Sequence, residues 1–202
     1  DPDFTNYTDR AQWFYFPRFA LEVTADGIVK HDSKKDITGR YVWRKNVIDH
    51  DVKLLDDMFT ITHPDGQTES TDFDITINPH GSNYFRYLIN SSRIYWRKEL
   101  EQNLADMTRE QADEYRAAHR FDIQGDGLTP DEIQEQKQCL INKIFTIGYM
   151  MHRFKSPSRP WAPFVMDNVI GENDQCNGGS GKSFMFKALS QFVNFVPLPG
   201  RN

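Results

Sequence analysis

The chain has 202 residues, of which 26% are charged and 13% aromatic, and its formal net charge is −5. This length fits one globular domain, or one domain and the beginning of another. The negative balance excludes attraction of nucleic acid by bulk charge, so any such binding needs a local basic patch. No apolar run approaches the roughly 18 residues of a membrane span. The two cysteines, Cys139 and Cys176, have neither a metal-ligand spacing nor a disulfide framework, which indicates a reducing cytosol.

The front of the chain, residues 13–77, is expected to form mostly strands and turns. "WFYFPRFALEV" is rich in strand-forming residues, and Asp26-Gly27 in "TADGIVK" predicts a hairpin turn. "GRYVWRKNV" and "MFTITHPDG" are further strand candidates, the second ending in a Pro64-Asp65-Gly66 turn. In "TDFDITINPHG" apolar and polar residues alternate, which predicts a half-buried strand.

Two helices are expected after this strand. Ser82 is a suitable N-cap for a helix that breaks near residues 90–92. Thr108 with Gln111 predicts a capping box that opens a short polar helix to about His119.

The strongest helix signal is "LTPDEI". Here Thr129 is the N-cap, Pro130 is the first helical residue and Glu132 completes a capping box. An apolar face with a spacing near 3.6 residues then continues through Ile133, Leu140, Ile141, Ile144, Phe145, Tyr149 and Met151.

A glycine-rich loop dominates the end of the chain. We expect "WAPFVMDNVI" to form a short strand leading to "NGGSGKSFMFKALSQF", in which residues 184–192 form a helix. Such a loop turns backbone N–H groups toward phosphate oxygens, while its lysine reaches the β- and γ-phosphates and its serine ligates Mg²⁺. The predicted nucleotide-binding residues are Asn177, Gly178, Gly179, Ser180, Gly181, Lys182 and Ser183, with Ser183 holding Mg²⁺ through the nucleotide.

Two features depart from the usual motif. Cys176 stands where the first glycine belongs, and "NVIGENDQC" is a long lead-in between strand and loop. The structural alternative is a solvated Gly/Ser linker that contains a lysine by chance.

The predicted fold class is α+β. Residues 1–125 form a β-rich α+β module, residues 126–160 a helical connector, and residues 161–202 the first strand, P-loop and helix of an α/β P-loop ATPase core.

The stretch from "LINKIFTIGYMMHRF" through "GGSGKSFMFKALSQF" resembles the beginning of the ATPase domain of superfamily-three helicases, above all the primase-helicases of phages and mobile elements. The matching features are Gly148–His152, Pro160–Val165, Glu172–Gln175 and Gly178–Ser183. The resemblance covers about residues 80–202. It implies an ATP- and Mg²⁺-dependent DNA helicase in the cytoplasm of a bacterial cell, acting on single-stranded DNA as a homo-oligomeric, hexameric ring.

The family's other catalytic parts are a Walker B acidic pair, a sensor residue and an arginine finger, which normally follow the loop by tens of residues. Only Val193–Asn202 follow here, and both ends of the chain look cut from something longer, so no catalytic residue is assigned. We expect weak nucleotide binding or none, and no hydrolysis, from these residues alone. The alternative function is a non-catalytic DNA- or protein-binding module with an incomplete, disordered P-loop.

Three metal sites are weighed against simpler interpretations. Asp122, Asp126 and Gly127 copy the front of an EF-hand loop, but Ile133 stands where the closing glutamate belongs, which favours a turn plus helix cap. Asp72 and Asp74 lie on one strand face near His80 and would suit Mg²⁺ in a primase site, although a solvent-facing edge explains them as well. "DHD" at residues 49–51 fits a surface turn better than a chelate.

Cations near aromatic residues on the first predicted helices are candidates for DNA contact, namely Arg86, Arg93, Arg97 and Lys98, with Tyr84, Tyr95 and Trp96 beside them. The alternative is that these aromatic side chains belong to the core and the cations to the solvated face. Arg153, Lys155 and Arg159 would instead contact a neighbouring subunit.

Overall fold

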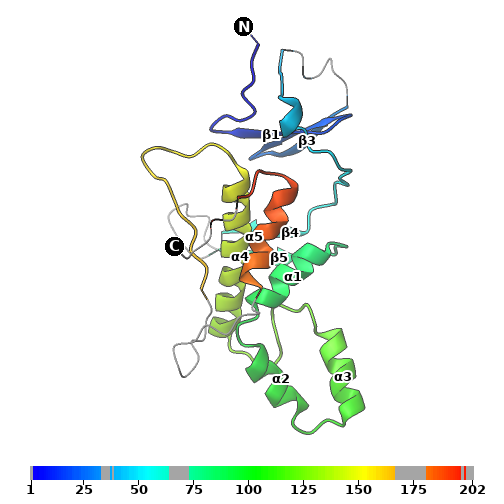
Figure 1. Ribbon diagram of the computed structural model, residues 1–202. Coiled ribbons are helices and arrows are strands. Elements are labelled where there is room, and N and C mark those ends of the chain that lie inside the picture. The colour runs from blue at the N-terminus through cyan, green and yellow to red at the C-terminus, as the bar shows by residue number, and fades with distance from the viewer. Residues whose placement is uncertain are drawn as a thin grey trace. The chain divides into compact units, whose positions relative to one another are not determined.

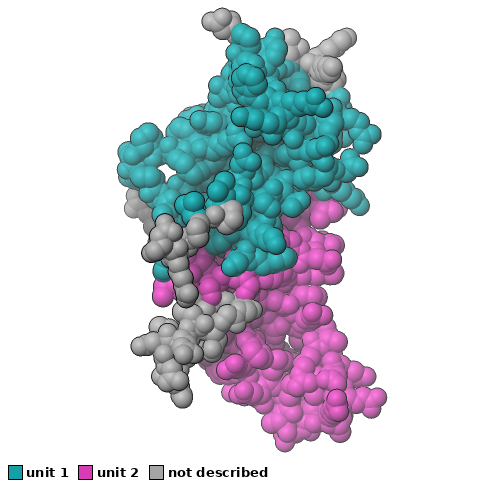
Figure 2. Space-filling view, in the orientation of Figure 1, with its two compact units in different colours: residues 1–53, 146–164, 183–202 teal, residues 54–145, 165–182 magenta. Residues whose placement is uncertain are grey.

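The computed structural model describes residues 2–32, 37, 39–63, 73–166, 181–196 and 198. The chain divides into two compact units (Figure 2). Unit 1 consists of residues 1–53, 146–164 and 183–202, and unit 2 of residues 54–145 and 165–182. Each unit therefore combines segments that are distant in the sequence, which differs from the three consecutive domains expected above.

The fold class of the described residues is mixed α+β, with two small antiparallel sheets and five α-helices. This confirms the α+β prediction. None of the helices among these residues is long and apolar enough to span a membrane.

Unit 1 contains a three-stranded antiparallel sheet in the order β1-β2-β3 (Figure 1). The strands are β1 (Ala11–Tyr15), β2 (Ala20–Thr24) and β3 (Gly27–His31). Pro17 lacks an N–H for a ladder and lies in the turn that splits "WFYFPRFALEV" into β1 and β2. The predicted hairpin is confirmed, with Ala25-Asp26 as its two-residue loop.

Both faces of this sheet carry apolar clusters, which explains why "WFYF" shows no polar alternation. Trp13, Tyr15 and Ala20 pack together with Ile37 and Val42 on one face. The other face carries a larger set, namely Phe14, Phe16 and Leu21 with Phe19, Val23, Ile48, Val52, Met151, Phe192 and Val193.

The strand expected in "GRYVWRKNV" is absent, and that prediction was wrong. Residues 41–43 have no regular secondary structure and lead into a 3₁₀ turn, η1 (Arg44–Asn46). Among the described residues, its one sheet-like pairing is an isolated bridge between Arg40 and Asp3. Strand composition alone does not make a strand, because the ladder needs a neighbour along its whole length.

Unit 2 begins with a two-stranded antiparallel sheet of β4 (Phe59–Thr62) and β5 (Asp74–Ile77). Both strands were predicted, whereas the Pro64-Asp65-Gly66 turn lies outside the described residues. Ile75 is fully buried, and Phe59 packs against Phe85 of the first helix with ring centroids 5.5 Å apart.

Four helices follow in chain order, and three of them, α1, α3 and α4, begin at the predicted caps Ser82, Thr108 and Thr129. They are α1 (Asn83–Ser92), α2 (Trp96–Leu104), α3 (Arg109–Ala118) and α4 (Pro130–Met151), of which residues 146–151 belong to unit 1. Ser82 Oγ accepts a hydrogen bond from Phe85 N at 3.2 Å, and Thr108 with Gln111 forms a capping box. At α4, Glu132 N donates to Thr129 Oγ1 at 3.3 Å and Thr129 N donates to Glu132 Oε2 at 2.8 Å.

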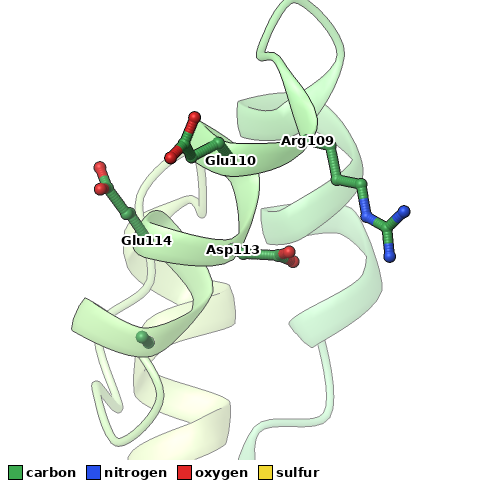
Figure 3. Close-up of a pocket in the computed structure, with 5 residues that line it drawn as sticks. Arg109, Glu110, Asp113 and Glu114 are labelled. Carbon is green, nitrogen blue, oxygen red and sulfur yellow. The ribbon is translucent and has the colours of Figure 1, made fainter.

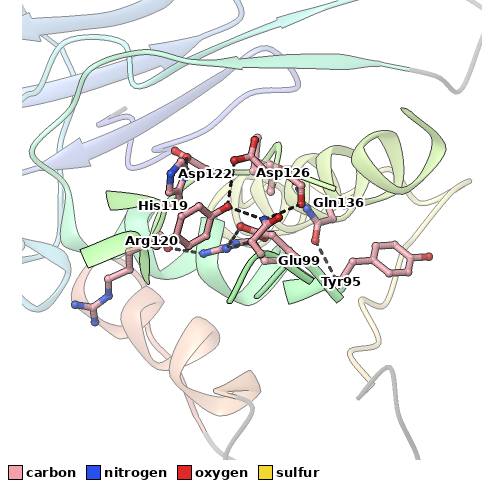
Figure 4. A network of polar contacts seen from close by, with 11 residues as sticks. Tyr95, Glu99, His119, Arg120, Asp122, Asp126 and Gln136 are labelled. Atoms are coloured by element: carbon pink, nitrogen blue, oxygen red, sulfur yellow. Dashed lines mark hydrogen bonds and ion pairs between the residues drawn. The ribbon is translucent and has the colours of Figure 1, made fainter. Parts of the chain in front are cut away.

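A buried ion pair joins the ends of these helices. Arg93, directly after α1, points its Nη2 at both carboxylate oxygens of Glu99 in α2, at 2.7 and 2.8 Å. Glu99 is 0% exposed and Arg93 8%. Arg93 Nη1 also donates to the backbone carbonyl of Arg120 after α3, at 2.9 Å (Figure 4). A methyl group on Gly125 would overlap the Glu99 carboxyl group, so the loop before α4 needs glycine for this close approach.

Gln136 connects the same region to α4. Its side chain is fully buried, its Nε2 donates to Ile123 O at 2.8 Å, and its Oε1 accepts from Tyr95 N at 3.0 Å (Figure 4). Lys143, about two turns further along α4, donates to Ser91 O and to Ser92 Oγ at the end of α1. A cation at that position stabilises the helix C-terminus, and burial lowers the pKa of Lys143.

Replacing Glu99 with alanine should destabilise the protein by about 3–5 kcal/mol, because it leaves the buried Arg93 charge unpaired. Asp113→Ala is the matched control, since it removes the exposed Arg116–Asp113 pair and should cost less than about 1 kcal/mol. Urea unfolding measures both. Equal losses in the two variants would contradict the importance of the buried pair.

Candidate functional site

The end of the predicted phosphate loop is the best-defined part of the candidate site. Gly181, Lys182 and Ser183 are described, and Asn177, Gly178, Gly179 and Ser180 lie outside the described residues. A helix, α5 (Lys182–Lys187), begins at the lysine and passes into a 3₁₀ turn, η2 (Ala188–Gln191). The predicted helix is therefore confirmed, and it begins two residues earlier than expected.

Gly181 has the backbone conformation that a glycine-rich turn before a helix requires. Its φ is +83°, in the left-handed region that side chains rarely adopt. The space beside it is also filled, since an added Cβ would lie 2.8 Å from the hydroxyl oxygen of Tyr87. Both the conformation and the packing require glycine at this position.

Tyr87 of α1 fixes the backbone at this point. Its hydroxyl donates a hydrogen bond to Gly181 O at 2.6 Å. The ring of Tyr84, one turn earlier, stacks near Tyr87 with centroids 6.0 Å apart, and burial raises the pKa of Tyr84 to about 12. Tyr84 is therefore neutral at physiological pH, and Tyr87 acts on the loop as a hydrogen-bond donor.

The strand expected before the loop is not found in its described part. Residues 161–166 have no strand pairing, and Phe164 is 85% exposed. In a P-loop core this strand is hydrogen-bonded between parallel neighbours; both sheets of the described residues are antiparallel and neither includes it. The prediction of a strand over residues 161–166 was wrong, and residues 167–170 lie outside the described part.

The carboxylates that would bind calcium, those of Asp122 and Asp126, are hydrogen-bonded to other side chains of the protein. Asp122 Oδ2 lies 2.8 Å from His119 Nδ1, and Asp126 Oδ2 accepts from the hydroxyl of Tyr115 at 3.2 Å (Figure 4). Glu132 serves the α4 cap, as the turn-plus-cap interpretation expects. Across the described part of the chain no group of three or more His, Cys, Asp or Glu side chains is arranged to hold a metal.

Asp74, the described half of the proposed primase pair, is held by a lysine. Lys137 Nζ donates to Asp74 Oδ1 at 2.7 Å, and Ile75 N donates to the same oxygen at 2.8 Å. The Lys137 hydrogen bond holds the pKa of Asp74 below its ordinary value. Asp72 lies outside the described residues.

The "DHD" turn is exposed, and Asp51 pairs with Arg18.

The four candidate DNA-binding cations do not form one exposed row. Arg93 is buried against Glu99, and Lys98 Nζ lies 2.6 Å from both carboxylate oxygens of Glu132. Arg97 lies over the Trp96 ring, and Arg86 over the Phe121 ring. Arg93 would have to leave Glu99 to touch DNA, so only Arg86 and Arg97 remain suitable for this role.

The cations expected to contact a neighbouring subunit make bonds within unit 1. Arg153 Nη1 donates to Asn6 Oδ1 at 3.2 Å, and Lys155 Nζ donates to Tyr149 O at 2.8 Å. Burial lowers the pKa of Lys155. Arg159 is exposed.

A pocket along α3 is lined mostly by acidic side chains. Figure 3 shows Glu110 and Glu114 on one side of the helix and Arg109 reaching away on the other. Asp113, also on this surface, is paired with Arg116. These side chains do not point toward one common position where a ligand could bind, and we assign the pocket no ligand.

Comparison of the chain with models of protein families, with curated proteins and with solved structures found no match. The resemblance to superfamily-three helicases therefore rests on the quoted residues alone.

Removing the Tyr87 hydroxyl should loosen the loop. Tyr87→Phe loses the hydrogen bond to Gly181, which should cost about 1 kcal/mol and speed hydrogen exchange at residues 181–187. Tyr95→Phe, which removes a hydroxyl bonded to Glu135 instead, is the control and should leave that exchange unchanged. Identical exchange in wild type and Tyr87→Phe would contradict the role assigned to Tyr87.

The Asp74–Lys137 pair should make stability depend on pH. Because the folded pKa of Asp74 is lowered, its contribution is complete above the unfolded value of about 3.9 and is lost as pH falls through the lower folded value. Asp74→Asn should therefore be less stable than wild type at neutral pH, and the difference should close in acid. Urea unfolding across this range measures it, with the exposed Asp106→Asn as control. A pH-independent difference would contradict the ion pair.

Proposed function

We propose that residues 177–183 form a phosphate-binding loop for Mg²⁺-ATP and that the chain is part of an ATP-dependent DNA helicase of the primase-helicase type. The observation that carries the proposal is the run Gly178 to Ser183 leading straight into α5, with Gly181 in the left-handed conformation. A solvated linker does not open directly into a helix with a buried Met185, followed by a 3₁₀ turn with a buried Leu189.

Each residue of the loop has a chemical role in this proposal. Lys182 would neutralise charge on the β- and γ-phosphates, and the exposed hydroxyl of Ser183 would be a Mg²⁺ ligand. Gly178, Gly179 and Gly181 would let backbone N–H groups approach the phosphate oxygens. Tyr87 supports the loop from α1 by holding the Gly181 carbonyl.

The proposal for these residues is binding and not hydrolysis. Walker B, sensor and arginine-finger residues are not assigned to any position of this sequence, and a P-loop alone does not supply the charges that stabilise the transferred phosphoryl group. Single-stranded DNA, a hexameric ring and a bacterial cytoplasm belong to the same proposal through the helicase resemblance.

A second function is a non-catalytic module that binds DNA or a partner protein. The exposed segment Trp161–Met166 favours it, because a P-loop ATPase needs a buried strand at that place.

Thermal unfolding with Mg²⁺-ATP distinguishes the two. A ligand at about 100 times its Kd adds about 2.7 kcal/mol, which for a chain of this size raises Tm by roughly 5–10 °C. Millimolar Mg²⁺-ATP should raise the Tm of the wild type and of Lys187→Ala, a matched change on the exposed side of α5. Lys182→Ala should lose the shift. An equal shift in Lys182→Ala, or none in the wild type, would contradict the proposal and favour the non-catalytic module.

A further inference from the structure

Unit 1 carries an exposed group of aromatic side chains that the phosphate loop does not explain. Phe4, Tyr41 and Trp43 are about half exposed, and the Phe4 and Trp43 rings stack with centroids 4.7 Å apart and 17° between their planes. Tyr41 lies beside Phe4 with centroids 5.8 Å apart. We call these three residues the aromatic platform.

The backbone explains why these rings point outward. Trp43 has an extended backbone, with φ −66° and ψ 133°, in which neighbouring side chains point to opposite sides. Val42 points inward and packs on the cluster of Trp13, Tyr15 and Ala20. Trp43 therefore points away from the sheet, and Tyr41 is half exposed.

The platform is held firmly from both sides. Tyr41 N donates to Asp3 O at 2.8 Å, and Arg40 Nη1 donates to Thr5 O at 3.4 Å, which fixes the segment that carries Phe4. After η1, Ile48 N donates to Tyr15 O of β1 at 2.8 Å. Rings fixed in this way lose little conformational entropy when another ring stacks on them.

Basic side chains follow the platform directly. Arg44 and Lys45 form the start of η1 and are exposed. Lys45 also lines a polar pocket of about 230 Å³ whose walls are residues 45–50, Arg153 and residues 190–194. Arg153 adds a second cation to this pocket, and Asp49 is its acidic residue. Positive charge therefore extends from the platform into the pocket, although the whole chain is acidic.

We propose that the aromatic platform and the basic groups beside it bind single-stranded nucleic acid. Every base offers a flat face for stacking on Trp43 or Tyr41, and Arg44, Lys45 and Arg153 would neutralise the phosphates between bases. The combination of stacked rings and local cations favours this ligand over a purely apolar protein partner. The inference does not depend on the phosphate loop, although it would supply a strand contact for the helicase proposed above.

Fluorescence anisotropy with labelled oligothymidylate and oligouridylate of about 16 nucleotides tests the proposal. The full chain should bind at low salt, and comparing the two oligomers tells DNA from RNA. Trp43→Ala should weaken binding about tenfold. Trp161→Ala is the matched control in the same unit, because Trp161 is 60% and Trp43 59% exposed, and it should leave affinity unchanged.

The double variant Arg44→Ala/Lys45→Ala tests the charge separately. Loss of two phosphate contacts should reduce the slope of log affinity against log salt by about 1.4, at roughly 0.7 for each contact on a single strand. Unfolding midpoints of all variants should match the wild type. If Trp43→Ala does not fold, this slope alone decides the proposal, and an unchanged slope overturns it.

The outcomes separate this inference from the nucleotide site. Lys182→Ala should keep its oligonucleotide affinity, and Trp43→Ala should keep its response to Mg²⁺-ATP. Absence of oligonucleotide binding in the wild type, or equal losses in Trp43→Ala and Trp161→Ala, overturns the inference. A proline-rich peptide whose binding alone depends on Trp43 would assign the platform to a protein partner and overturn it as well.

Discussion

The buried ion pair between Arg93 and Glu99 is the interaction on which the arrangement of unit 2 depends. It joins the end of α1 to α2, and through the Arg120 carbonyl it reaches the segment after α3. Gly125 must be small for Glu99 to lie where it does, and Gln136 extends the network to α4. Burying two charges away from water costs free energy, and the ion pair offsets this cost. Removal of either partner would leave an unpaired buried charge, which destabilises the fold. The four helices of unit 2 are consequently fixed by polar contacts as much as by their apolar faces.

This arrangement determines what the end of the glycine-rich loop can do. The helix that delivers Arg93 to its partner also carries Tyr87, whose hydroxyl holds the Gly181 carbonyl. Displacing α1 would move Tyr87 with it, and Gly181 would lose its support. The same helix thus positions both the buried charge of Arg93 and the tyrosine that supports the candidate phosphate loop. This explains why Arg93 is better understood as a structural residue than as a contact to DNA. Unit 1 is built differently, from a sheet covered by apolar side chains on both faces.

Local signals in the sequence predicted the parts of the fold that local interactions determine. Ser82, Thr108 and Thr129 were recognised as caps because the bonds they make lie within three residues. The Tyr87–Gly181 hydrogen bond joins residues 94 positions apart, and the residues around Tyr87 and around Gly181 contain no pattern that predicts it. The Arg93–Glu99 pair is close in sequence, yet its burial depends on Gly125 and Arg120, so the sequence suggests for Arg93 a DNA contact or a solvated face instead. Residues 41–43 and 161–166 have strand composition without a strand, because composition does not supply a neighbouring strand to pair with.

The central claim is that the glycine-rich loop binds the phosphates of a nucleotide, and the most direct measurement is an experimental structure with Mg²⁺ and a non-hydrolysable ATP analogue. The account predicts phosphate oxygens about 2.7–3.2 Å from the backbone nitrogens of residues 178–183. It also predicts Lys182 Nζ beside the β- and γ-phosphates and the Ser183 hydroxyl on Mg²⁺. A nucleotide bound elsewhere on the chain, or none bound at saturating concentration, would contradict it.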